Sequence, residues 1–121
     1  MFELAIRSDF ASAHFLKGYE GKCKTLHGHT WKVEMVIESD RLDNIGMVAD
    51  FAILKKQLKD FLEVLDHVHL NELPYFKDTN PTTENLAKYI YEEFPKKYPS
   101  VKPKRVTVWE SDCASVTYCV V

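Results

Sequence analysis

The chain places a thiol and two imidazoles within seven residues, in the segment Cys23-Lys24-Thr25-Leu26-His27-Gly28-His29. In an extended backbone, side chains two residues apart point to the same face, so His27 and His29 are directed toward one point. Neutral imidazole is the commonest metal ligand in proteins, and zinc typically binds such nitrogens. His14 is the only histidine upstream. We therefore predict a zinc site of His14, His27 and His29 with one position left open.

The same segment opens a predicted strand that runs from about residue 27 to residue 39. One parity of this strand carries both histidines and then apolar residues, whereas the other parity is mostly charged or polar. Residues 2–14 alternate in a similar way, which is typical of a half-buried strand and places His14 on the apolar face. The metal ligands are therefore expected at one end of an apolar sheet face.

Two helices are predicted in the middle of the chain. The first begins after Asp50, a favourable N-cap, and extends to near Leu65. The second is capped by Thr82 or Thr83 and is expected to end where Pro95 and Pro99 interrupt the pattern.

Two further strands are predicted at residues 106–110 and 116–120, joined by a short turn at residues 111–114. The order ββααββ indicates an α+β fold, with a four-stranded antiparallel sheet and both helices on one face. Two helices cover only one face of such a sheet, so we expect the other face to meet solvent or another subunit, and the protein to be an oligomer.

Composition excludes several classes of protein. The 121 residues are expected to form a single domain, residues 1–121. A net charge of −2 gives no reason to expect nucleic acid or an anionic membrane as a partner. No apolar run is long enough for a membrane span, and the first residues do not read as a secretory signal. Three cysteines argue against a disulfide framework, so we expect a cytoplasmic protein.

The cysteines admit more than one interpretation. Cys23 either completes a closed Cys-His₃ zinc site or is a reactive thiol beside an open one, and nearby zinc would favour its thiolate in both cases. Cys113 and Cys119 are expected to be packing residues, because free cysteine behaves as a small hydrophobe.

The carboxylates of Asp66 and Glu110 each admit two interpretations. The pair Asp66-His67 either marks the end of a helix or forms an acid/base pair in which the carboxylate orients the imidazole. Glu110 is either a solvated carboxylate at a strand end or a buried acceptor for a planar pair of N–H groups.

Seven pieces of the chain together resemble the 6-pyruvoyltetrahydropterin synthase family, and within it the bacterial 6-carboxy-5,6,7,8-tetrahydropterin synthase branch. In order, they are Phe10-Ala11-Ser12-Ala13-His14, Cys23-Lys24-Thr25-Leu26-His27-Gly28-His29, Met47-Val48-Ala49-Asp50-Phe51, Leu65-Asp66-His67, Leu70-Asn71, Asn80-Pro81-Thr82-Thr83-Glu84-Asn85-Leu86 and Glu110. The spacing Cys-x₃-His-Gly-His is characteristic of the queuosine-pathway branch. The folate-linked branch has glutamate at the position of Cys23.

The resemblance implies a tunnelling fold, in which three subunits close their sheets into a twelve-stranded barrel and two trimers stack as a homohexamer. It implies that His14, His27 and His29 bind Zn²⁺ and that Cys23 is the general base or a proton shuttle. It further implies that Asp66 and His67 come from a neighbouring subunit as the partner acid/base pair. Glu110 would anchor the amino-pyrimidine edge of a pterin, and Thr82 and Thr83 would line that pocket.

The implied reaction converts 7,8-dihydroneopterin triphosphate to 6-carboxy-5,6,7,8-tetrahydropterin, with release of acetaldehyde and triphosphate. Three alternatives compete with it. One is formation of 6-pyruvoyltetrahydropterin, which stops after triphosphate loss and internal hydrogen transfer. Another is a zinc hydrolase in which Cys23 is incidental. The third is a non-enzymatic, zinc-stabilised binding module that would unfold upon chelation.

Overall fold

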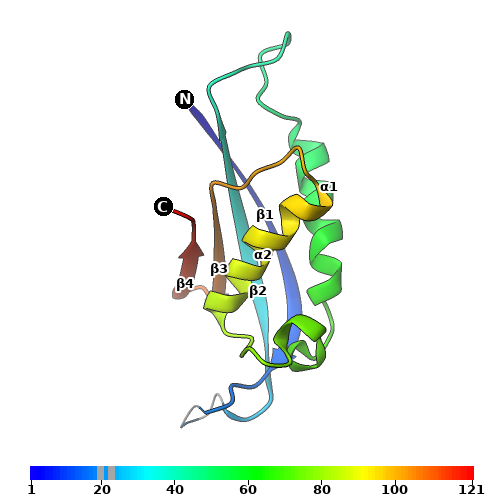
Figure 1. Ribbon diagram of the computed structural model, residues 1–121, viewed down its shortest axis with the longest axis vertical. Helices are drawn as coiled ribbons and strands as arrows, with labels where there is room; N and C mark the ends of the chain where they lie inside the picture. Colours follow the sequence, from blue (N-terminus) through cyan, green and yellow to red (C-terminus); the bar gives the residue numbers. More distant parts are fainter. Residues whose placement is uncertain (19–20, 22–23) are drawn as a thin grey trace.

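The computed structural model describes residues 1–18, 21 and 24–121. In these residues, β1 (Phe2–His14), β2 (His27–Ser39), β3 (Arg105–Ser111) and β4 (Ala114–Tyr118) form an antiparallel sheet in the order β1-β2-β3-β4. Helices α1 (Phe51–Leu62) and α2 (Thr83–Lys97) lie on the same side of that sheet (Figure 1). The predicted four-stranded antiparallel sheet with two helices on one face is confirmed.

β1 and β2 are paired along their whole length, and this register positions the histidines. Phe10 lies opposite Trp31, Ser12 opposite His29, and His14 opposite His27. The alternation predicted for both strands is therefore correct, and all three histidines belong to the face that the helices cover. The core lies between this face and the helices, and its largest fully buried side chains include Phe10, Trp31, Met35, Leu58, Phe76 and Phe94.

The helices begin where the sequence predicts. The Asp50 carboxylate accepts a hydrogen bond from the Ala52 N–H at 2.8 Å, and the Thr82 hydroxyl accepts one from the Asn85 N–H at 3.1 Å. A single 3₁₀ turn, Glu63–Leu65, extends α1 to the predicted end. None of the described helices has the length and apolar character needed to cross a membrane.

Helix α2 ends at Lys97, between Pro95 and Pro99 as predicted. Pro95 lies inside its last turn, where a proline removes only one backbone hydrogen bond while the buried Phe94 keeps that turn packed on the core. One predicted end was wrong: strand β4 ends at Tyr118, so the predicted strand residue Val120 lies beyond it and is exposed.

The sheet face opposite the helices is polar and charged. Arg7 bonds Glu34 at 2.7 Å, and Glu3 contacts both Lys104 at 2.8 Å and Arg105 at 2.9 Å. The prediction that Cys113 and Cys119 are packing residues was wrong for the single chain. Both thiols are exposed, since Cys113 lies in the turn between β3 and β4 and Cys119 follows the last residue of β4.

Candidate metal centre

Side chains from three neighbouring strands meet at one end of the helix-covered face. His14 comes from the end of β1, His27 and His29 from the start of β2, and Glu110 from near the end of β3. One ligand atom from each lies within 4.8 Å of the others, a separation that can accommodate a metal ion. The structure thus brings together the three histidines that the sequence singles out and adds Glu110 to them.

Backbone carbonyls orient two of the imidazoles. Nδ1 of His14 lies 2.7 Å from the Pro81 carbonyl oxygen, and Nδ1 of His27 lies 2.7 Å from that of Thr25. A carbonyl oxygen can only accept, so each Nδ1 carries the proton and donates it. Such hydrogen bonds to backbone carbonyls are typical of metal-ligating histidines, because they leave Nε2 free to bind. Both Nε2 atoms then face the centre of the cluster.

The Nε2 atoms inside the cluster lack ordinary partners. Those of His14 and His27 are 3.0 Å apart, so they must share either a proton or a metal ion. Nε2 of His29 is buried and has no hydrogen-bond partner in the part of the chain that the structure describes, although it lies 3.1 Å from Oε1 of Glu110. Converging nitrogens of this kind fit a divalent transition metal, and zinc binds imidazole readily.

Burial favours the metal-binding form of these imidazoles. It lowers the pKa of His14 below the usual value, and the neighbouring His27 and His29 lower it further, whereas the hydrogen bond to Pro81 opposes the shift. Burial also lowers the pKa of His29, with the charge of Glu110 acting in the opposite direction. Near neutral pH both rings are therefore uncharged, the state in which a histidine binds metal.

The aromatic side chains of Trp31 and Phe10 lie between the cluster and the core. The ring centroid of Trp31 lies 4.9 Å from that of His14 and 5.0 Å from that of His29, with the rings edge to face. Phe10 stacks beneath Trp31 at 5.3 Å. Because Trp31 is fully buried, it shields the imidazoles from water on the side that faces the core.

Glu110 occupies a break in the pairing of β3 with β4. Trp109 pairs with Ser115 and Ser111 pairs with Ala114, which leaves Glu110 between them without a partner. Bulges of this kind redirect a side chain, and they occur often beside active sites. Oε2 of Glu110 accepts a hydrogen bond from the Thr83 hydroxyl at 2.8 Å, while Oε1 is directed to His29.

The two threonines differ in what they contact. Thr83 is buried and touches Glu110, so it belongs to the cluster's surroundings. The Thr82 hydroxyl serves instead as the cap of α2. The sequence predicts that both threonines line the pocket. Their positions at the start of α2 place only the Thr83 hydroxyl against Glu110.

Asp66 and His67 form a close pair, but at a different place. Nδ1 of His67 lies 2.8 Å from Oδ2 of Asp66, and Oδ1 of Asp66 accepts from the Ala11 N–H at 2.8 Å. The hydrogen bond from Ala11 and then that from His67 lower the pKa of Asp66. The His67 side chain is 81% exposed, and neither residue belongs to the four-residue cluster. Within one chain the pair is assembled at the outer edge of β1 rather than at the metal centre.

Cys23, the thiol predicted beside the zinc, lies outside the described residues. The sequence interpretation missed three contributors to the cluster: the carbonyls of Thr25 and Pro81, and Glu110 as a neighbour of His29. Backbone groups carry no sequence signal. The position of Glu110 depends on a bulge that no glycine marks.

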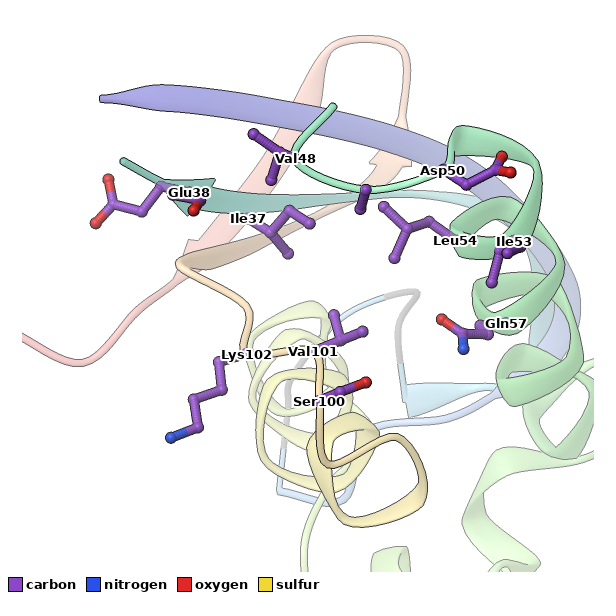
Figure 2. Close-up of a pocket in the computed structure, with 12 residues that line it drawn as sticks. Ile37, Glu38, Val48, Asp50, Ile53, Leu54, Gln57, Ser100, Val101 and Lys102 are labelled. Carbon is purple, nitrogen blue, oxygen red and sulfur yellow. The ribbon is translucent and has the colours of Figure 1, made fainter. Parts of the chain in front are cut away.

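A hollow of about 470 Å³ lies at the end of β2 away from the histidine cluster. Figure 2 shows apolar side chains around it, among them Ile37, Leu54 and Val101, while the charged ends of Glu38 and Lys102 are directed away from it. The predicted site residues are absent from its lining, so it is not the candidate site.

Comparison with known proteins agrees with this geometry. The family model described as 6-pyruvoyl tetrahydropterin synthase matches residues 3–119. Dihydroneopterin monophosphate aldolase of Pyrococcus furiosus is 40% identical over 107 residues, covering 88% of this chain and 87% of the relative. The 6-carboxy-5,6,7,8-tetrahydropterin synthase of Rickettsia bellii is 32% identical over 120 residues, covering 84% and 87%.

Among solved structures, 6-pyruvoyl tetrahydropterin synthase of Caenorhabditis elegans superposes with a TM-score of 0.80 at 32% identity, covering 99% of this chain and 96% of that one. The match of the family model spans nearly the whole sequence, and the similarity in structure extends equally far. This chain belongs to the 6-pyruvoyl tetrahydropterin synthase family.

Proposed function

We propose that this single-domain protein is a zinc-dependent lyase of queuosine biosynthesis in the cytoplasm. It converts 7,8-dihydroneopterin triphosphate and water to 6-carboxy-5,6,7,8-tetrahydropterin, acetaldehyde and triphosphate. The observation that carries the proposal is the convergence of three imidazole nitrogens beside the Glu110 carboxylate, because this arrangement offers one site for a metal and one for a pterin edge. The sequence Cys23-x₃-His27-Gly28-His29 favours the carboxy-forming branch.

His14, His27 and His29 would hold the zinc ion through Nε2. When bound, zinc supplies Lewis acidity toward the oxygens of the substrate side chain and so makes the neighbouring C–H bonds more acidic. The carbonyls of Pro81 and Thr25 keep the rings of His14 and His27 turned toward the site. Trp31 closes the site on the core side and limits the access of water.

Glu110 would accept the two N–H groups of the amino-pyrimidine edge, a bidentate pairing that suits a carboxylate. The Thr83 hydroxyl holds Oε2 of that carboxylate in place. Thr82, as the cap of α2, supports this pocket through the position of Thr83 rather than by its own hydroxyl.

Cys23 and the Asp66–His67 pair would move the protons. Asp66 holds Nδ1 of His67, which leaves Nε2 to exchange a proton with the substrate. Because His67 is exposed and remote from the cluster within one chain, the pair must act on the site of another subunit. We therefore include the homohexamer in the proposal, in which three four-stranded sheets close a barrel and two trimers stack.

Two related activities are second candidates, because an aldolase and a 6-pyruvoyl tetrahydropterin synthase are among the relatives that match most of the chain. An aldolase acting on a dihydroneopterin phosphate would split the side chain and release a two-carbon aldehyde that keeps its phosphate. A 6-pyruvoyltetrahydropterin synthase would release triphosphate and no aldehyde.

Product analysis separates these activities. The zinc-loaded protein is incubated with 7,8-dihydroneopterin triphosphate, and separately with the monophosphate. Acetaldehyde and the 6-carboxypterin in equal amounts support the proposal. A pyruvoyl product without aldehyde, or glycolaldehyde phosphate from the monophosphate, would replace it with the corresponding alternative. The His27→Ala protein is the control for contaminating activities.

A further inference from the structure

The chain beyond β1 is held by side chains rather than by a neighbouring strand. β1 ends at His14, yet the backbone of Phe15 and of Lys17 remains fully hydrogen-bonded. Asn71 accepts from the Phe15 N–H at 2.9 Å and donates to the Phe15 carbonyl at 3.0 Å. Asn80 accepts from the Lys17 N–H at 2.9 Å and donates to the Lys17 carbonyl at 2.8 Å.

These four hydrogen bonds imitate a strand pairing. A carboxamide offers the same donor and acceptor as a peptide group, so one asparagine can satisfy both groups of one residue. Phe15 and Lys17 are two residues apart, the spacing at which a partner strand would also bond an extended chain. We call Asn71 and Asn80 the asparagine clamp. Aspartate could not replace either residue, since its second oxygen would face a carbonyl oxygen.

The clamp is connected to the metal centre through Asn80. The residue after Asn80 is Pro81, whose carbonyl accepts the Nδ1–H of His14. The carbonyl of Asn80 itself accepts from the Asn85 side chain and from the Thr82 N–H, both at 2.8 Å, which ties it to the start of α2. A closed circuit therefore runs from the His14 backbone through Lys17, Asn80 and Pro81, and back to the His14 ring.

This circuit constrains the imidazole from both ends. Lys17, three residues after His14, cannot shift relative to Pro81 without breaking its hydrogen bonds to Asn80, and the His14 ring cannot rotate without losing its hydrogen bond to Pro81. We propose that Asn71 and Asn80 are positioning residues of the metal centre, which keep the His14 ring in the Nδ1–H tautomer with Nε2 directed at the metal. The inference rests on the proposed function, because it assumes that the cluster binds zinc.

The first experiment measures zinc affinity by competition with a chelating dye in four proteins: wild type, Asn80→Ala, Asn71→Ala and Asn44→Ala. Asn44 is the matched control, because it lies in the exposed connection between β2 and α1. Asn80→Ala is expected to weaken zinc binding about tenfold, as loss of a residue that orients a ligand typically does. Asn71→Ala should weaken it less, because the closed circuit does not pass through Asn71, and Asn44→Ala should leave it unchanged.

Hydrogen exchange at the Lys17 amide shows whether the clamp has opened in a folded variant. If that amide becomes unprotected in Asn80→Ala while zinc affinity stays at the wild-type value, the clamp is only structural and the inference is wrong. If Asn80→Ala does not fold, Asn80→Ser, which adds no charge, takes its place. Weaker zinc binding in that variant supports the clamp, and wild-type affinity with an unprotected Lys17 amide overturns the inference.

A metal-free measurement separates this inference from the proposed function. The ¹⁵N chemical shifts of the His14 ring report which nitrogen carries the proton. We expect the Nδ1–H tautomer in the wild type and a mixture in Asn80→Ala. An unchanged tautomer would contradict the clamp even if the enzyme forms acetaldehyde. A shifted tautomer in a protein that binds no zinc would support the clamp and reject the proposed metal centre.

Discussion

The chain holds two groups of side chains, a cluster of three histidines and a separate Asp66–His67 pair, that differ in almost every physical respect. His14, His27 and His29 are buried or half-buried and bring ligand atoms within 4.8 Å of one another, and the rings of His14 and His29 pack against the fully buried Trp31. His67 is 81% exposed, has a positive φ of 55°, and contacts Asp66 at the edge of the sheet. The first group comes together within one chain, whereas the second lies apart from it in the same chain.

This difference indicates which chemical role each group has in the proposed enzyme. Burial keeps imidazoles neutral and suits metal binding, whereas an exposed imidazole paired with a carboxylate suits proton transfer. The two groups lie on separate surfaces of one chain, so the proposed reaction requires that they meet across a subunit interface.

The largest effect is expected from the buried group. His27→Ala removes one of three proposed ligands and should weaken zinc binding by more than the roughly 10–100-fold that loss of a merely orienting residue causes. Calorimetric zinc titration and product formation measure the two consequences. His67→Ala is the control for removal of an imidazole and should bind zinc as the wild type does. Equal zinc affinity in both variants would contradict the assignment.

The exposed pair should affect turnover and leave zinc affinity unchanged. Removal of a general acid or base typically costs about 10²–10⁴-fold in rate, so His67→Ala should lose activity by that order. Asp66→Asn should lose less, because the imidazole remains but is less well oriented. Steady-state rates at saturating zinc check this prediction.

A mixing experiment tests whether the pair acts on another subunit. Inactive His67→Ala and inactive His27→Ala chains are unfolded together, refolded in equal amounts and assayed. Mixed oligomers should regain part of the activity, because some sites receive their metal ligands from one chain and His67 from another. If the mixture stays as inactive as its components, the two groups act within one chain or not at all.

The sequence predicts the buried group well because strand alternation is a local property. His14, His27 and His29 share a face once β1 and β2 are extended, and the period of two is enough to place them. Glu110 could not be placed beside His29, since its direction depends on a bulge between Trp109 and Ser111. The location of His67 could not be predicted either, because its left-handed backbone follows no residue pattern.

Substitution of Glu110 tests whether this carboxylate belongs to the substrate site. Glu110→Gln replaces one charge-assisted acceptor with a donor and should weaken pterin binding by about 1.5–3 kcal/mol, the range for hydrogen bonds to charged groups. Fluorescence titration with a pterin measures the loss. Thr83→Val keeps the carboxylate but removes its hydrogen bond, so it should lose less. Unchanged affinity in Glu110→Gln would remove Glu110 from the substrate site.

The smallest effect concerns stability far from both groups of side chains. Contacts with Lys104 and Arg105 lower the pKa of Glu3 from 4.5 to about 2. A lowered folded-state pKa contributes stability above pH 4.5 that is lost as the pH falls from 4.5 toward 2. Urea unfolding at pH 7 and pH 3 should therefore show a smaller decrease for Glu3→Gln than for the wild type. An equal decrease would show that this exposed contact contributes nothing.

The central claim is that one chain holds zinc through three imidazoles and leaves a position that a substrate can occupy. X-ray absorption at the zinc edge of the loaded protein measures the ligand set directly. We predict three imidazole nitrogens at about 2.0–2.1 Å and one further oxygen, with no sulfur. A sulfur neighbour at about 2.3 Å together with three imidazoles would indicate a closed Cys-His₃ site and contradict the account.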